Sequence, residues 1–156
     1  MLLRIAVAGL LGASLGPASP RPDAPDQAPA QAPPRTADQL IARFRKAHES
    51  RAIATILGLI YWGNAEPEMH RTMERNIAAD FGLAIKGIAL QPLAKDQRLE
   101  YTRNGVLYRP TLRPVGQLKV EFLPEPGKDQ QLRSSSYLVG IQDGVYFLLT
   151  AAPVPR

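Results

Sequence analysis

The sequence contains no cysteine among its 156 residues. This absence excludes a disulfide framework, a thiol nucleophile, a zinc site built on cysteine and a lipid-modified N-terminal cysteine. Aromatic residues are also few: they make up 6% of the chain, with Trp62 as the single tryptophan. Hydrophobic residues, at 45%, and charged residues, at 21%, are nevertheless in the range of a globular protein. The chain therefore has enough apolar material for one core.

Clusters of like charge are missing as well, although the net charge is +5. Nucleic-acid binding needs a clustered basic surface, so we expect no nucleic-acid partner. The standard phosphate-binding, dinucleotide-binding, zinc-protease and serine-hydrolase motifs are absent, and we expect no cofactor. His70 and Glu74 are neighbours at helical spacing, but no third ligand accompanies them. We therefore expect no metal site.

The first 18 residues have the order of a secretory signal peptide. Arg4 precedes an apolar run from Ile5 to Leu15, and small residues follow as far as Ala18. The run is too short to cross about 30 Å of hydrocarbon, which takes about 20 residues. We therefore expect residues 1–18 to be a cleaved signal peptide, the protein to be secreted or periplasmic, and no stable membrane span. An ordinary N-terminal core helix is the alternative interpretation.

Proline is concentrated in the next stretch, with seven of the 15 prolines between residues 17 and 34. Proline lacks the N–H that helices and sheets use, and few of the neighbouring side chains could be buried. We therefore predict that residues 19–35 form a disordered proline-rich linker, which would act as a semi-stiff spacer. Residues 36–156 remain as the folded domain.

Hydrophobic residues then recur at helical spacing in three segments. Thr36 and Gln39 have the spacing of a capping box, which predicts the start of the first helix. We expect Ser50 to cap the second helix, Gly63 to end it and Pro67 to begin the third. The three apolar stripes contain Leu40, Phe44, Ala47 and His48; Ile53, Ile56, Leu57, Ile60 and Tyr61; and Met69, Met73, Ile77 and Phe81.

After residue 83 the hydrophobic period changes to that of strands. The dipeptide Asn104-Gly105 suits a two-residue turn in which both residues are left-handed. It predicts a hairpin that places Tyr101 opposite Tyr108. Residues 118–122 alternate apolar and polar side chains, which is typical of a half-buried strand.

Residues 134–151 predict a second hairpin around Asp143-Gly144, and this hairpin is apolar on both faces. A sheet with one face in water would alternate apolar with polar residues, so both faces should be covered. Helices can cover one face, and the other needs a closed curl of the sheet or a second subunit. We therefore predict a possible homodimer through the sheet. The two faces carry Leu138, Val145, Phe147 and Leu149, and Tyr137, Val139, Ile141, Tyr146 and Leu148.

The order of these elements resembles the nuclear transport factor 2-like (SnoaL-like) superfamily, a cystatin-like α+β cone. The resemblance is carried by residues 40–44, 53–62 and 69–81 and by the strands that begin at Leu118 and Tyr137. It implies an α+β fold in which three N-terminal helices pack on a curved antiparallel sheet and leave a pocket at the mouth of the cone. The superfamily includes isomerases, dehydratases and binding domains, so the fold alone does not select a function.

Five side chains are candidates for the wall of that pocket. Tyr61 and Trp62 are adjacent at the end of the second predicted helix, while Tyr101 and Tyr137 lie in the two hairpins. Core packing or stiffening of a hairpin is the alternative role for these aromatic residues. His48 continues the stripe of the first helix, where it could be a base or a hydrogen-bonded residue near the end of the helix.

Catalysis of the isomerase type would need a carboxylate that points into the pocket and an acid such as tyrosine. Strand parity places Glu121 on a polar face and pairs Glu100 with Arg109 across the first hairpin. Asp143 belongs to a turn, and Asp80 to the last turn of the third helix. We therefore expect no carboxylate to point inward and assign no catalytic residue.

These observations favour an exported, non-enzymatic binding or interaction domain. Its partner would be a small apolar ligand, another protein or a second copy of the chain. The alternative is a small cofactor-independent isomerase or dehydratase that uses His48, Tyr61 or Tyr101 in the cavity. A third possibility is a structural accessory domain held away from the cell surface on its proline-rich spacer.

Overall fold

The computed structural model describes residues 32–124 and 133–155. The chain divides into two units at Gln31, and only the second contains described residues. The predicted signal peptide and all but the end of the predicted linker therefore lie outside the described residues. In the part that is described, no helix is both long enough and apolar enough to cross a membrane.

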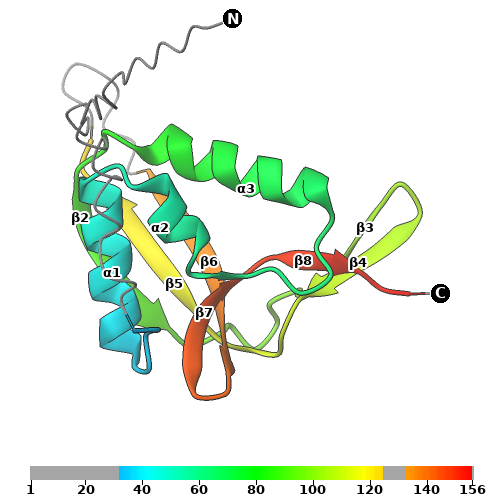
Figure 1. Cartoon of the computed structure of the whole chain (residues 1–156). Coiled ribbons are helices and arrows are strands. Elements are labelled where there is room, and N and C mark those ends of the chain that lie inside the picture. Colours follow the sequence, from blue (N-terminus) through cyan, green and yellow to red (C-terminus); the bar gives the residue numbers. More distant parts are fainter. Residues whose placement is uncertain (1–31, 125–132, 156) are drawn as a thin grey trace, which may run out of the picture. The chain divides into compact units, whose positions relative to one another are not determined.

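The described chain is an α+β fold with two sheets (Figure 1). Its helices are α1 (Ala37–Glu49), α2 (Ile53–Leu57) and α3 (Pro67–Asp80). The five-stranded sheet has the order β1-β7-β6-β5-β2, from β1 (Ile60–Tyr61), β7 (Val145–Leu149), β6 (Ser134–Gln142), β5 (Pro114–Phe122) and β2 (Ile85–Gln91). The three-stranded sheet has the order β3-β4-β8, from β3 (Tyr101–Arg103), β4 (Val106–Pro110) and β8 (Ala151–Pro153).

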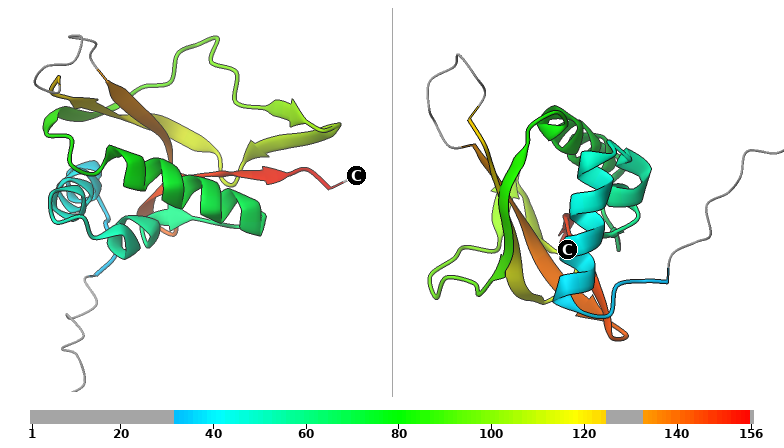
Figure 2. Two further views of the ribbon diagram at one scale, coloured as in Figure 1. Left: turned by 90° about the horizontal axis from the view of Figure 1, so that it is seen from above. Right: turned by 90° about the vertical axis from the view of Figure 1, so that its left-hand side faces the viewer.

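The predicted α+β class is confirmed, but the predicted cone of three N-terminal helices on a single curved sheet is wrong. Figure 2 shows the helices on one side of the five-stranded sheet. The strands divide into two sheets because the chain leaves β7 after Leu149 and pairs as β8 with β4. In addition, a short strand, β1, separates α2 from α3.

The first helix, α1, begins as its sequence indicates. Thr36 accepts a hydrogen bond from the backbone N–H of Gln39 at 3.2 Å. The side chain of Gln39 reaches back one residue further than in a capping box and accepts from the N–H of Arg35 at 2.7 Å. The predicted stripe of α1 is buried: Leu40, Phe44, Ala47 and His48 are each at most 4% exposed.

The predicted role of Ser50 is wrong. Ser50 ends α1, where its hydroxyl donates to the carbonyl of Lys46 at 2.8 Å. The residue before α2 is Ala52, which has no side chain that could accept a capping hydrogen bond. A serine that follows a helix can bond back to the preceding turn as readily as forward, and here the free carbonyls of α1 are nearer.

The predicted length of the second helix is also wrong, because α2 ends at Leu57. Ile60 and Tyr61 form β1, which runs parallel to β7 and pairs with Leu148 and Leu149. The N–H of Leu148 donates to the carbonyl of Leu59 at 2.9 Å. Since Leu148 is fully buried, this bond supplies a partner for a backbone group that water cannot reach.

Both predicted hairpins are confirmed in their register. Tyr101 lies opposite Tyr108, and Val139 lies opposite Leu148. Asn104 and Gly105 have φ angles of 52° and 74°. These left-handed values match the turn in which both central residues have positive φ.

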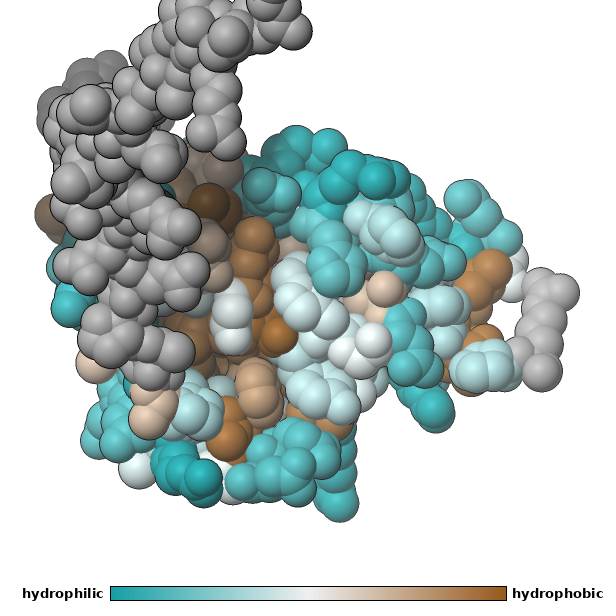
Figure 3. Space-filling model, in the orientation of Figure 1, coloured by the Kyte–Doolittle hydropathy of each residue, from teal (hydrophilic) through white to brown (hydrophobic). Residues whose placement is uncertain are grey.

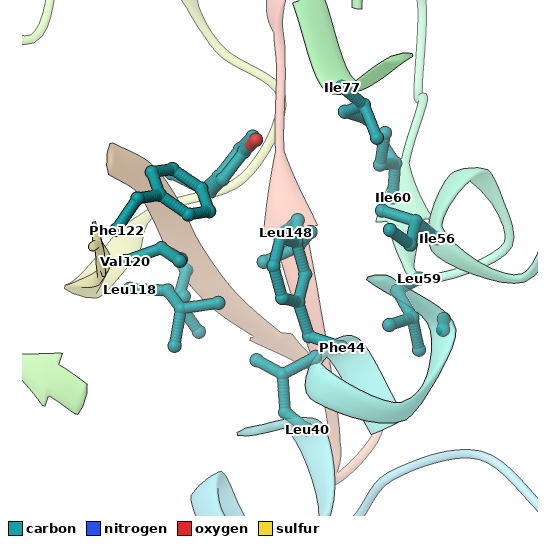
Figure 4. Packing of buried hydrophobic residues seen from close by; sticks show 13 residues of the cluster. Leu40, Phe44, Ile56, Leu59, Ile60, Ile77, Leu118, Val120, Phe122 and Leu148 are labelled. Atoms are coloured by element: carbon teal, nitrogen blue, oxygen red, sulfur yellow. The ribbon is translucent and has the colours of Figure 1, made fainter. Parts of the chain in front are cut away.

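The hydrophobic core lies between the helices and the inner face of the five-stranded sheet. Figure 4 shows Leu40 and Phe44 of α1 between the row Leu118, Val120 and Phe122 of β5 and the residues that follow α1. Leu148 of β7 lies between the two groups (Figure 4). On the outside, hydrophobic side chains gather over α2, while hydrophilic ones cover the outward side of α3 (Figure 3).

The second face of the terminal hairpin is covered in part by the chain itself. A Cβ placed on Gly140 would lie 3.2 Å from the Cβ of Leu112, so the segment after β4 packs directly on this face. The rings of Tyr61 and Phe147 also meet there, with centroids 5.6 Å apart. Ile141, which lies on the opposite face, remains 40% exposed.

Candidate functional site

A cleft of about 620 Å³ lies beside α3, where the two sheets separate. Its volume is in the range of ligand pockets, about 300–1,000 Å³. Its wall is partly apolar, with Met69 and Met73 from α3 and Leu138 and Leu149 from the five-stranded sheet. The cleft is open rather than enclosed, so a ligand could enter without any movement of the fold.

The division of the sheet creates this cleft. The last printed pair between β6 and β7 is Val139 with Leu148, and the following strand, β8, pairs with β4 instead. Residues 134–138 of β6 consequently have β5 on one side and no strand on the other within the described chain. All five of these residues line the cleft.

Asp80, the last residue of α3, is the charged group most deeply placed in this cleft. Its side chain is 6% exposed, and one carboxylate oxygen, Oδ2, accepts from the hydroxyl of Ser135 at 2.5 Å. The other oxygen, Oδ1, forms an ion pair with Arg133 at 2.9 Å. The expectation that no carboxylate points inward is therefore wrong.

The phase of α3 explains why Asp80 is buried. Met73, Ile77 and Asp80 are spaced four and three residues apart, so the carboxylate continues the apolar stripe of the helix. Ser135 and Arg133 then provide the hydrogen bond and the opposite charge that a buried carboxylate requires. The spacing was visible in the sequence, whereas the two partners, 53 and more residues further on, were not.

Tyr137 is a predicted site residue that does line the cleft. It is 9% exposed, and its ring packs on Phe44 with centroids 5.4 Å apart. Burial raises the pKa of Tyr137 to about 12, and the negative charge of Asp80 adds to this shift, while the hydroxyl of Ser135 opposes it. The phenol is therefore neutral at physiological pH and can donate a hydrogen bond.

Tyr101 also lines the cleft, from the opposite wall. It is 42% exposed, and its ring stacks on Tyr108 with centroids 5.3 Å apart. The hydroxyl of Tyr108 donates to Glu66 at 2.8 Å, and this hydrogen bond is the main reason that the pKa of Tyr108 is raised. The bond ties the first hairpin to the start of α3 and so holds the outer wall of the cleft.

The other three predicted site residues lie outside the cleft. His48 is 4% exposed, lies 5.5 Å from the rings of Phe81 and Phe122, and contacts the backbone carbonyl of Asp80 through Nε2 at 3.1 Å. Tyr61 packs against Phe147. Trp62 stacks on the ring of His70, with centroids 3.7 Å apart.

Thr150 is a cleft residue that the sequence analysis missed. It is 6% exposed, and its hydroxyl has no hydrogen-bond partner in the part of the chain that the structure describes. A buried hydroxyl without a partner destabilises a fold by about 1–3 kcal/mol. A ligand that supplied a partner would recover this free energy.

Metal binding has no support in the described residues, where no group of three or more His, Asp or Glu side chains is placed to hold an ion. In comparisons with known proteins, no protein-family model and no curated protein matches the chain.

Proposed function

We propose that this chain is an exported, non-enzymatic binding domain whose site is the cleft beside α3. The observation that carries the proposal is the composition of the cleft. Apolar side chains from α3 and β6 form one part of its wall, and the Asp80–Arg133 ion pair and the free hydroxyl of Thr150 form polar points within it. Such a surface suits a ligand with both apolar and hydrogen-bonding parts.

We further propose that the chain is a divergent relative of the nuclear transport factor 2-like superfamily. Support comes from the order of the elements, with α1, α2 and α3 preceding the long antiparallel strands β5 and β6. Export is proposed from the leader of residues 1–18 alone.

An enzyme of isomerase or dehydratase type is the second candidate, and the observation that favours it is that Asp80 and Tyr137 line the same cleft. We rank it second because both oxygens of Asp80 already have partners, Ser135 and Arg133. A general base must have a free oxygen within hydrogen-bond reach of the substrate.

Two matched variants of α3 test the binding proposal. Ala79 and Ala78 are both exposed on α3, but only Ala79 lines the cleft. Ala79→Trp should fill the cleft, while Ala78→Trp adds the same side chain outside it. The probe is 8-anilinonaphthalene-1-sulfonate, which has an apolar body and an anionic group.

We expect the wild type and Ala78→Trp to bind the probe alike, and Ala79→Trp to bind it about tenfold more weakly, a loss of about 1.4 kcal/mol. Circular dichroism would confirm that all three proteins are folded. If Ala79→Trp binds like the wild type, the cleft is not the binding site.

A further inference from the structure

The separation of the two sheets exposes main-chain groups as well as side chains, and this points to the chemical class of the ligand. Resting on the binding function proposed above, we propose that the cleft receives an extended peptide segment of a partner protein. The segment would add as a strand to the open edge of β6.

Hydrogen bonds on either side of β6 show which of its backbone groups face the cleft. The N–H of Phe122 in β5 donates to the carbonyl of Arg133 at 2.9 Å, so residue 133 faces β5. Successive residues of a strand direct their N–H and C=O groups to opposite edges. Ser135 and Tyr137 therefore also face β5, while Ser134 and Ser136 face the other edge.

The β6–β7 hairpin leads independently to the same assignment. Its two-residue turn at Asp143-Gly144 makes the flanking residues, Gln142 and Val145, a hydrogen-bonded pair. Counting back along β6, Gly140 also faces β7. The even-numbered residues 134 and 136 lie on this same edge, but β7 ends before it reaches them.

The opposite side of the cleft carries a second strand edge. The N–H of Thr111 donates to the carbonyl of Thr150 at 3.0 Å, and the N–H of Val154 donates to the carbonyl of Leu107 at 2.8 Å. Residues 150 and 154 therefore face β4. Ala151 directs its N–H and C=O away from β4, and Ala151 lines the cleft.

Unpaired main-chain groups at a strand edge select for another main chain. An extended peptide presents N–H and C=O groups at the spacing of a strand, so it can pair with Ser134 and Ser136 in succession. A purely apolar molecule would cover these groups without bonding them, at a cost of about 1–3 kcal/mol for each group. A partner strand along residues 134–138 is about as long as a typical strand.

The chain's own proline-rich stretch is a poor occupant. Proline has no N–H to donate to a ladder, and seven prolines fall between residues 17 and 34. The side chains of the cleft instead suit a foreign segment. Arg98 and Arg133 line the cleft together with Asp80, so the cleft carries one net positive charge and favours an acidic residue in the peptide.

The experiment begins with a displayed library of random linear peptides, selected on the full chain and counter-selected on Ala79→Trp. Selected peptides are then synthesised with N-methyl groups at single positions. We expect N-methylation to weaken binding by about tenfold or more at alternate positions only, because only every second N–H of an added strand faces β6. Equal effects at all positions, or none at any position, would contradict strand addition.

Amide hydrogen exchange on the wild-type protein gives a second readout that needs no folded variant. Bound peptide should slow exchange at Ser134 and Ser136 by about tenfold or more, and leave Ser135 and Tyr137 unchanged because they are already paired with β5. Among variants, Ser136→Pro removes the N–H that faces the cleft, and Ser136→Ala keeps it. We expect only Ser136→Pro to lose peptide binding.

The outcomes separate this proposal from the binding function on which it rests. If the anilinonaphthalene probe binds the cleft but no peptide is selected, strand addition is wrong and the binding function stands. If neither binds, both fail. If exchange at Ser134 and Ser136 slows with increasing protein concentration alone, a second copy covers the edge and the peptide proposal is overturned.

Discussion

The buried phenol of Tyr137 predicts how the stability of the protein depends on alkaline pH. In the folded chain its pKa is raised to about 12, first by burial and then by the charge of Asp80. In the unfolded chain a tyrosine titrates near 10. The folded state therefore keeps this proton to higher pH, and the stability that it contributes is fully present below pH 10 and is lost as pH rises through 12.

The magnitude follows from the two pKa values. A shift of about two units corresponds to about 2.7 kcal/mol, of which about 1.4 kcal/mol is lost by pH 11. Tyr137→Phe keeps the ring but removes the ionisable hydroxyl. We expect the free energy of unfolding of the wild type to fall by about 1.4 kcal/mol more than that of Tyr137→Phe between pH 9 and pH 11.

Urea unfolding of both proteins at the two pH values measures this difference. Lysines and the other tyrosines titrate in both proteins, so their contributions cancel in the comparison. Tyr146→Phe, in the neighbouring strand β7 and outside the cleft, is the matched control and should behave as the wild type. Parallel pH dependences for the wild type and Tyr137→Phe would refute the reasoning.

Three further predictions concern the core, the leader and the oligomeric state. Phe44 is 1% exposed and contacts Tyr137 and His48, so Phe44→Ala should lower the free energy of unfolding by about 3–5 kcal/mol in a urea titration. The mass of the protein exported by its host should lack at least residues 1–18, and an intact leader would contradict export by cleavage. Light scattering should give twice the mass of one chain if the predicted homodimer forms, and a monomer would remove that prediction.

The candidate site was only partly predictable from the sequence. Tyr101 and Tyr137 line the cleft as expected, because hairpin registers follow from local turn residues such as Asn104-Gly105. Tyr61 and Trp62 were misplaced because the stripe through residue 61 fits a helix and a helix followed by a buried strand equally well. Such short apolar segments are ambiguous until a partner strand is known.

The sequence by itself determined the α+β class, the start of α1, the stripe of α3 and both hairpin turns, since each depends on residues within a few positions of one another. Only the tertiary structure decided that β8 pairs with β4 instead of extending β7 along β6. That choice sets strands about 40 residues apart side by side, and it opens the cleft and brings Arg133 and Ser135 to Asp80. Contacts of this range depend on which edges remain free after local structure has formed, and no local period encodes them.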